Sequence, residues 1–176
     1  FPTRRSSDLG YVDKESSMKR RVVITGMGTV NPIGNSVKEA WESVKNNKCG
    51  IAPITSFDTT DFTVKLAGEV KGFDADALLG KKECKRMDRY TQLALGAAIE
   101  AVDDSGIDFE KEDTARCGVI VSSGIGGLKT IEDEHAKGLQ RGFNRISPFF
   151  IPMAISNIAA GQIAIRYGLH GMCTCV

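Results

Sequence analysis

Residues 116–127, RCGVIVSSGIGG, decide the fold class of this chain. The apolar run over Arg116–Ser122 is continuous, as in a strand that is covered on both faces of a sheet. Gly124–Gly127 then leads the chain into a polar stretch, which predicts a helix over about 128–140. A buried strand followed at once by a glycine turn and a helix is the repeating unit of an α/β fold.

The stretches on either side extend this pattern. Tyr90–Asp104 is apolar on nearly every side, which predicts a largely buried helix. A second helix with few polar positions is expected over Met153–Tyr167, after the aromatic connection Ser147–Pro152. The chain then ends in a strand-like run, Met172–Val176.

The N-terminal part repeats the order of strand and helix. Arg20–Thr25 (RRVVIT) predicts a short strand buried on both faces, and Gly26–Gly28 turns out of it. A helix is expected over Val37–Asn46, capped at residue 35 or 36. Because strands alternate with helices, the sequence predicts an α/β class with a mostly parallel sheet and right-handed crossovers.

Composition excludes several classes of protein. The chain has 176 residues, of which 41% are hydrophobic and 26% charged, which is typical of a globular protein. Its 23 Lys and Arg balance 22 Asp and Glu, so the overall charge gives no sign of a nucleic-acid partner. No apolar run approaches the roughly 20 residues of a membrane helix, so no membrane association is expected. The five cysteines are scattered and odd in number, which favours a reducing cytoplasm over a disulfide framework.

Both ends of the sequence are unusual. Residues 1–17 have no apolar period and precede Met18, where the strand-like run begins, so we expect a non-native or disordered leader. The chain stops a few residues into a new buried strand, at Val176. Residues 18–176 are therefore expected to be a truncated domain.

One glycine motif suggests an alternative function. Gly26-Met-Gly28 follows a predicted strand, as in the G-x-G-x-x-G loop that binds the pyrophosphate of a dinucleotide. Asn31 stands at the third glycine position and Pro32 follows at once, so the helix cannot begin where the phosphate needs it. A structural turn is the favoured interpretation, and a nucleotide-binding oxidoreductase is the alternative.

The loop over residues 122–127 has two possible functions. Its backbone N–H groups could hold a phosphate or another anion at the start of the following helix. No P-loop lysine follows in the required place, so the loop could equally line a pocket with its backbone and one apolar side chain, Ile125.

The histidines and cysteines do not predict a reactive site. His135 and His170 lack the three or four convergent ligands of a metal centre, so no metal is expected. Cys173 and Cys175 lie in a strand-like run, where cysteines behave as small apolar residues, and neither is interpreted as a nucleophile. No cofactor is expected.

A basic run precedes the first buried helix. Residues 81–89 (KKECKRMDR) contain five basic and two acidic residues. Such a run is usually a solvated face, but it is also suited to docking an acidic protein partner. Nucleic acid is a less suitable partner, because aromatic residues are not interleaved with the charges.

Taken in order, five segments are similar to those of a known enzyme family. They are KRRVVITGMGTVNPIGN, FDTTDF, KKECKRMDRYTQLALGAAIEAVDDSG, SSGIGGL and RISPFFIPMAISNIAAGQIAIRYGLHG. From Met18 onward, the chain resembles the N-terminal part of a 3-oxoacyl-[acyl-carrier-protein] synthase of the type II class. SPFFIP and SGIGG, in this order and spacing, are the specific motifs.

The resemblance implies a thiolase-like fold with five layers, α-β-α-β-α, built from two similar halves, of which this chain holds the N-terminal one. It also implies a cytoplasmic homodimer that performs a decarboxylative Claisen condensation in fatty acid synthesis, with acyl carrier protein as its partner. The nucleophilic cysteine and two catalytic histidines would lie beyond Val176, so the segment itself is expected to be inactive. A polyketide-type ketosynthase and a non-catalytic relative of the chain-length-factor type are the alternatives.

The resemblance implies roles for residues inside the chain. Ile125 matches the residue that gates the acyl pocket, and Phe150 matches a pocket residue that reaches across the dimer interface. The residues that match the basic docking patch for the acidic carrier protein are Lys82, Lys85 and Arg86, extended by Arg145.

Overall fold

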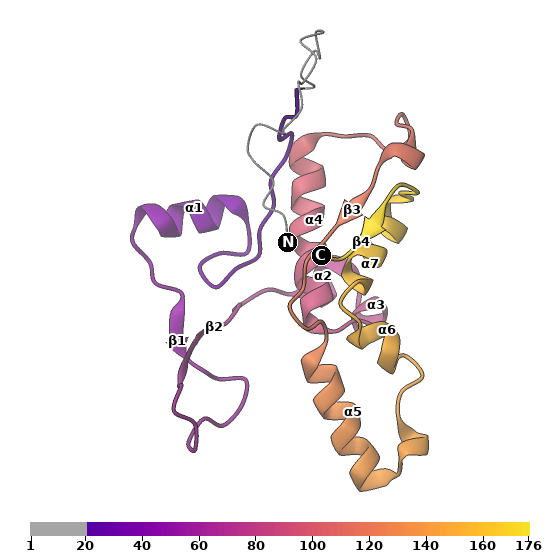
Figure 1. The fold of residues 1–176 in the computed structure, drawn as a ribbon. Helices are drawn as coiled ribbons and strands as arrows, with labels where there is room; N and C mark the ends of the chain where they lie inside the picture. Colours follow the sequence, from indigo (N-terminus) through magenta and orange to yellow (C-terminus); the bar gives the residue numbers. More distant parts are fainter. Residues whose placement is uncertain (1–20) are drawn as a thin grey trace, which may run out of the picture.

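The computed structural model of the chain describes residues 21–176, which fold into two regions (Figure 1). The N-terminal lobe, residues 31–72, holds a helix and a hairpin, and the body, residues 73–176, holds the other elements. The expected leader, residues 1–17, lies outside the described residues. In chain order the elements are α1 (Val37–Lys45), β1 (Ile51–Pro53), β2 (Leu66–Gly68), α2 (Ala75–Leu79), α3 (Lys81–Cys84), α4 (Arg89–Ser105), η2 (Thr114–Arg116), β3 (Val119–Ile120), α5 (Leu128–Arg141), η3 (Phe143–Arg145), α6 (Phe150–Ala154), α7 (Ile158–Tyr167) and β4 (Cys173–Thr174).

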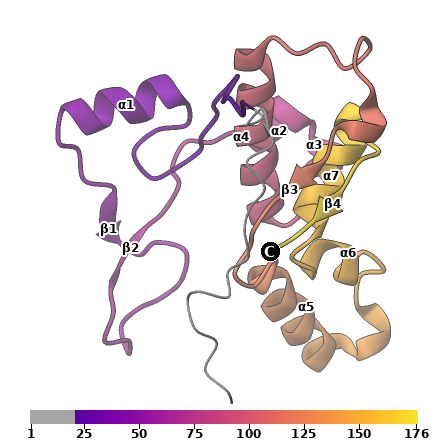
Figure 2. The same cartoon turned by 45° about the horizontal axis from the view of Figure 1, so that its top comes forward.

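The core of the body lies where α4, α7 and a small parallel sheet meet. Strands β3 and β4 pair in parallel, with Val119 opposite Cys173, and Figure 2 shows both strands beside α7. Leu95 of α4 packs here against small side chains of α7, which allow the two helices to approach closely. The predicted α/β class is therefore confirmed, whereas a mostly parallel sheet is not observed, because one of the two described strand pairs is parallel and the other antiparallel. The buried members of the core are Leu95, Val119, Ala160, Ile163 and Ala164.

Helix α4 extends one residue beyond the predicted range, Tyr90–Asp104, at each end. The Asp88 side chain caps its first turn by accepting a hydrogen bond from the Tyr90 N–H at 3.2 Å. Gly106 ends it in the left-handed conformation, with φ of 65°. The expectation of burial on nearly all sides is wrong, because within α4 the fully buried residues are Thr91, Leu95 and Gly96. Its described helical neighbours, α2 and α7, leave the other side chains partly exposed.

The predicted strand over Arg20–Thr25 is not observed in its described part. Residues 21–25 form neither helix nor strand, and the side chains of Val22, Val23 and Ile24 are 93%, 63% and 84% exposed. A strand requires a hydrogen-bonded neighbour, and none of the described strands pairs with this run. Among residues 21–176, no sheet is therefore present that this apolar run could join.

The helix predicted over Met153–Tyr167 is divided into two. Helix α6 begins earlier than predicted, at Phe150, and ends at Ala154, and α7 begins at Ile158. Ile155 between them is extended, and the Tyr90 hydroxyl donates a hydrogen bond to its carbonyl oxygen. The interruption between α6 and α7 is therefore stabilised by a residue of α4, a contact that the hydrophobic pattern of residues 153–167 cannot reveal.

The N-terminal lobe joins α1 to an antiparallel hairpin of β1 and β2. Ser36 caps α1 by accepting a hydrogen bond from the Glu39 N–H at 3.2 Å, which confirms the predicted cap. Glu100 of α4 accepts hydrogen bonds from the N–H of Val37 in the lobe, at 2.8 Å, and from that of Thr29 just before the lobe, at 2.9 Å. Of the helices within residues 21–176, none is long and apolar enough to cross a membrane.

Candidate functional site

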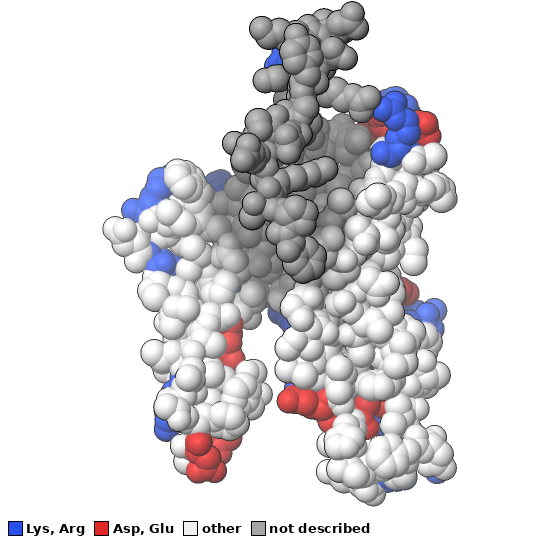
Figure 3. Space-filling view, in the orientation of Figure 1, with Lys and Arg blue, Asp and Glu red and all other residues white. Residues whose placement is uncertain are grey.

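The predicted docking residues lie on and just after α3. We call residues 81–87 the docking segment, and within it the side chains of Lys82, Lys85 and Arg86 are exposed. None of these three cations forms a salt bridge with a described residue. Figure 3 shows a mostly uncharged face, with Lys and Arg gathered toward its edges. An acidic partner would therefore find cations that no described carboxylate already neutralises.

Arg86 is in contact with the segment that carries Phe150. Its guanidinium carbon lies 5.1 Å from the centroid of the Phe149 ring, within the range of a cation–π contact. Arg145, the fourth predicted docking residue, is exposed at the end of η3, shortly before Phe149 in the chain. The structure therefore connects the docking segment to the connection between α5 and α6, and places Arg145 on that connection.

Glu134 of α5 fixes the start of the SPFFIP stretch. Its carboxylate accepts a hydrogen bond from the Ser147 N–H at 2.6 Å and pairs with Lys137 at 3.1 Å. These contacts, the Ser147 hydrogen bond first, hold the pKa of Glu134 below its ordinary value. Phe150, which follows shortly after, is half-buried at the first position of α6.

The second predicted pocket residue lies in a glycine loop pressed against α6. We call residues 122–127 the gate loop, and its Ile125 side chain is 62% exposed. The Gly126 N–H donates to Ser123 Oγ and the Gly127 N–H to the Ala154 carbonyl oxygen, both at 2.9 Å. Two of the N–H groups that an anion would need are therefore occupied, which favours the pocket-lining interpretation over the anion site.

Only glycine fits where the gate loop meets α6. Gly126 has a positive φ of 85°, and a Cβ there would lie 2.3 Å from the Ala154 carbonyl oxygen. Because the loop abuts the end of α6 and Phe150 begins the same short helix, the structure brings the two predicted pocket residues onto neighbouring elements.

Asp88 is a site residue that sequence reasoning did not single out. Its Oδ2 accepts hydrogen bonds from the N–H and the hydroxyl of Thr130, at 3.1 and 2.6 Å, while Oδ1 accepts the Tyr90 N–H. Asp88 is therefore shared between the first turns of α4 and α5, although 42 residues separate it from Thr130. An aspartate before a helix signals a cap, but no local signal names this second partner.

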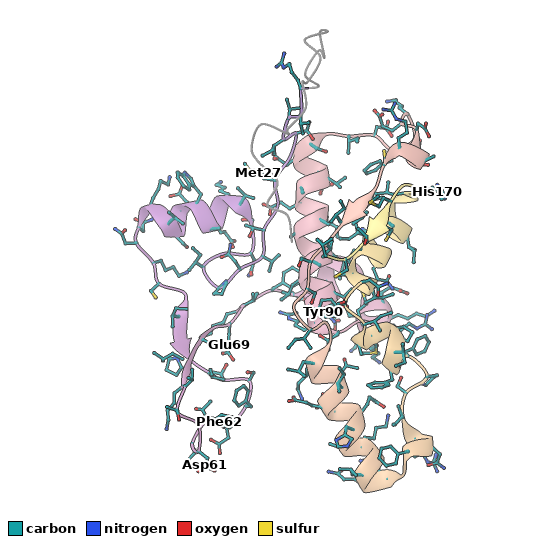
Figure 4. The ribbon with its side chains drawn as sticks, viewed as in Figure 1. Met27, Asp61, Phe62, Glu69, Tyr90 and His170 are labelled. Carbon is teal, nitrogen blue, oxygen red and sulfur yellow. The ribbon has the colours of Figure 1, made fainter. Side chains whose placement is uncertain are left out.

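Tyr90 completes the contacts around Asp88. Figure 4 shows it near the point where α4, the start of α5 and the α6–α7 segment converge. Its hydroxyl is bonded to Ile155, and burial raises the pKa of Tyr90 above its ordinary value. Two residues just after the docking segment therefore make distant contacts. Asp88 is hydrogen-bonded to Thr130 of α5, and Tyr90 to Ile155 between α6 and α7.

The dinucleotide alternative is contradicted by the packing of its glycines. A Cβ at Gly26 would lie 2.2 Å from the Ala101 carbonyl oxygen, and one at Gly28 would lie 2.0 Å from that of Ala97. The N–H groups between and after them donate to Asp104 and Glu100 at 2.9 Å. The glycines thus allow close approach to α4, and the carboxylates nearby would repel a phosphate. The predicted turn itself is not observed, since residues 26–28 form neither a turn nor a bend.

The histidines and cysteines remain apart from these contacts. His135 is exposed on α5, and the exposed His170 lies 3.1 Å from Thr114 Oγ1, toward the far side of the body in Figure 4. Cys173 and Cys175 are free thiols in and beside β4. Within residues 21–176, no group of three or more His, Cys, Asp or Glu side chains could hold a metal ion.

Curated relatives match nearly all of this chain. The 3-oxoacyl-[acyl-carrier-protein] synthase 2 of Vibrio cholerae is 44% identical over 153 residues, 87% of this chain and 37% of the relative. The synthase of the same name from Staphylococcus aureus is 47% identical over 155 residues, 88% of this chain and 37% of the relative. The chain therefore spans little more than a third of the length of these relatives.

Solved structures share the fold. The ishigamide ketosynthase/chain length factor has a TM-score of 0.80 at 28% identity, over 89% of this chain and 40% of that one. A ketosynthase solved with its type II polyketide acyl-carrier protein has a TM-score of 0.70 at 23% identity, over 84% of this chain and 39% of that one. The family model for the β-ketoacyl synthase N-terminal domain matches residues 19–176. The chain therefore belongs to the β-ketoacyl synthase family, as a segment of its N-terminal domain.

Proposed function

We propose that the full-length protein containing this segment is an acyltransferase, a 3-oxoacyl-[acyl-carrier-protein] synthase of the type II class, which elongates acyl chains in fatty acid synthesis. The observation that carries this proposal is the 44–47% identity to synthases of that name over 87–88% of the chain. The protein works in the cytoplasm as a homodimer and needs no cofactor.

The proposed reaction has two stages. A cysteine thiolate first attacks the acyl thioester of the carrier protein, forming a new thioester and releasing the carrier thiol. Malonyl-carrier protein then loses its carboxylate as CO2, and the carbanion left behind attacks the acyl carbonyl, forming a carbon–carbon bond and releasing the cysteine thiolate. The cysteine and two histidines that perform these steps lie beyond Val176, so residues 18–176 supply recognition and no reacting group.

The carrier protein docks on Lys82, Lys85 and Arg86 of the docking segment and on Arg145. The exposure of these side chains, and the lack of a described carboxylate partner for Lys82, Lys85 and Arg86, support this assignment. Ile125 and Phe150 line the acyl pocket, with Phe150 reaching the pocket of the partner subunit. Their apolar side chains lie on elements that touch each other, which supports a shared pocket wall.

Charge reversal tests the docking assignment. In the full-length protein, Lys82, Lys85 and Arg86 changed together to Glu should raise KM for carrier-protein substrates roughly tenfold or more, because like charges then face the acidic partner. The loss should be larger at low salt, where the native attraction is strongest.

The matched control replaces three exposed lysines of the N-terminal lobe by Glu, with the same change in net charge. They are Lys38, Lys48 and Lys71. It should leave KM for carrier substrates near the native value. Equal effects of the two triple variants would show that net charge, and not a docking patch, determines KM.

A non-catalytic relative of the chain-length-factor type is the second candidate. It is raised by the ishigamide ketosynthase/chain length factor, a structure with a TM-score of 0.80 whose name covers both a ketosynthase and a chain length factor. The two candidates differ in covalent chemistry, since only a synthase retains an acyl group on its own cysteine. The full-length protein is incubated with carrier protein whose acyl group is radiolabelled. A synthase should keep the label covalently bound after denaturation. A protein without bound label would favour the second candidate.

A further inference from the structure

Asp88 connects the docking segment to the gate loop through a single buried carboxylate. It is 8% exposed and directly follows Met87, the last residue of the docking segment. One oxygen caps α4 through the Tyr90 N–H, and the other accepts both the N–H and the hydroxyl of Thr130 in the first turn of α5. The α5 helix begins where the gate loop ends, so this carboxylate holds the starts of two helices together.

The gate loop is closely packed against this carboxylate. A Cβ at Gly127, the last residue of the gate loop, would lie 3.0 Å from Asp88 Oδ2 and 2.6 Å from the Met153 carbonyl oxygen. The loop is therefore confined between Asp88 on one side and α6 on the other. Close-packed contacts of this kind transmit a displacement instead of absorbing it.

A bound partner could change the contact between Arg86 and the segment that leads into α6. Its guanidinium lies over the Phe149 ring, which directly precedes Phe150 at the start of α6. A carboxylate on the partner competes for an exposed guanidinium, because charge-assisted hydrogen bonds are stronger than a solvent-exposed cation–π contact. A partner carboxylate that binds Arg86 would favour an arrangement in which its contact with Phe149 is loosened, and a ligand shifts a population only through such a difference in affinity.

We propose that Asp88 is a positioning residue that couples the docking segment to the gate loop, so that docking of an acidic carrier protein shifts residues 122–127. This inference rests on the proposed function, since it takes the carrier protein as the partner of the docking segment. Thr130 receives the displacement, because both of its hydrogen-bond donors end on Asp88. The gate over the acyl pocket then responds to docking before any acyl chain enters.

Hydrogen–deuterium exchange of the full-length protein tests the coupling. The probe is the acyl carrier protein of the same organism in its apo form, which lacks the pantetheine arm and cannot touch the pocket directly. Adding it should change the exchange rate of peptides covering 122–130 by about fivefold, at the lower end of measured couplings between sites. Thr130→Val, which removes the hydroxyl and keeps the shape of the side chain, should reduce this response to less than about twofold.

Two further variants separate positioning from general stability. Thr130→Ser keeps the hydroxyl and should retain the response, whereas Asp88→Asn has one acceptor oxygen instead of two and should lose it. Affinity for the carrier, measured by calorimetry, should stay near the native value in both Thr130 variants, because Thr130 is not in the docking segment.

Each outcome bears on a different claim. Carrier binding with no change in the gate loop would overturn the coupling and leave the proposed function standing. A response in Thr130→Val and in Asp88→Asn as large as that of the native protein would overturn the role of this carboxylate. No carrier binding by the native protein would overturn both the proposed docking and the coupling that depends on it.

Discussion

The N-terminal lobe is attached through carboxylates, whereas the body is built on small apolar side chains. Glu100 accepts two backbone N–H groups at the border of the lobe, and Glu69 accepts three donors in the hairpin loop. In the body, Ala159 and Ala160 are fully buried, and Leu95 is 2% exposed. Figure 3 shows open space between the hairpin of the lobe and α5 of the body. The difference indicates that the two regions can lose structure separately.

The largest effect is expected in the core of the body. Leu95→Ala should destabilise the chain by about 2–5 kcal/mol, because a buried side chain is replaced by a cavity between α4 and α7. Chemical denaturation followed by circular dichroism measures the change. The control, Leu139→Ala, alters a side chain that is 67% exposed and should shift stability by less than about 0.5 kcal/mol.

A smaller and local effect is expected at the border. Glu100→Gln leaves one acceptor oxygen for the N–H groups of Thr29 and Val37 and should lower the local stability of the lobe by roughly 1–3 kcal/mol. Amide exchange should accelerate in residues 29–45 while the core of α7 stays protected. Glu112→Gln, at an exposed position, is the control. If exchange in α7 accelerates equally, the two regions form one cooperative unit.

The break between α6 and α7 should respond more weakly. Tyr90→Phe removes the hydroxyl that donates to Ile155 and should reduce stability by about 1 kcal/mol. Thermal unfolding measures this, and Tyr167→Phe is the matched control, since that ring packs against Phe109 at 5.4 Å. An undisturbed melting temperature in Tyr90→Phe would show that the break persists without its partner.

The smallest effect is a pH dependence confined to the hairpin of the lobe. Hydrogen bonds from Thr55 and Ser56 lower the pKa of Glu69 from 4.5 to about 2. Because the folded pKa is depressed, this contribution is fully present above pH 4.5 and is lost as pH falls through about 2. Figure 4 shows Glu69 in the hairpin region, away from the body.

Amide signals of Thr55 and Ser56 in an NMR titration should follow this loss. A Glu69→Gln variant, which does not titrate, provides the baseline. Signals that move identically in the variant would assign the transition to another carboxylate.

Local signals predicted some helix limits and missed others. Ser36, one of the two expected caps, marks the start of α1, since a cap depends on residues within one turn. The division between α6 and α7 was not predicted. Contacts across space were not predicted, such as Asp88 with Thr130 and Tyr90 with Ile155, which lie 42 and 65 residues apart. The strand expected over Arg20–Thr25 failed for a related reason, because a strand depends on its neighbour as much as on its own residues.

The same distinction applies to the candidate site. The docking cations are exposed, as a charged run on a solvated face predicts, whereas the 62% exposure of Ile125 was not predicted. The carboxylate that connects them was overlooked, because its role lies in a second helix far along the chain. The roles of Ile125, Phe150 and the docking cations stay predictions, and the contacts among their elements come from the structure alone.

The left-handed end of α4 has a consequence for chirality. Gly106 has a φ of 65°, and apart from its neighbours in the chain no heavy atom of residues 21–176 lies within 4 Å of where its Cβ would be. An L-residue there would fit the space but strain the backbone by about 1–2 kcal/mol. A D-alanine introduced by chemical synthesis would instead prefer this conformation and restrict the unfolded chain. At this one position, a mirror-image amino acid should suit the protein better than the achiral residue it has.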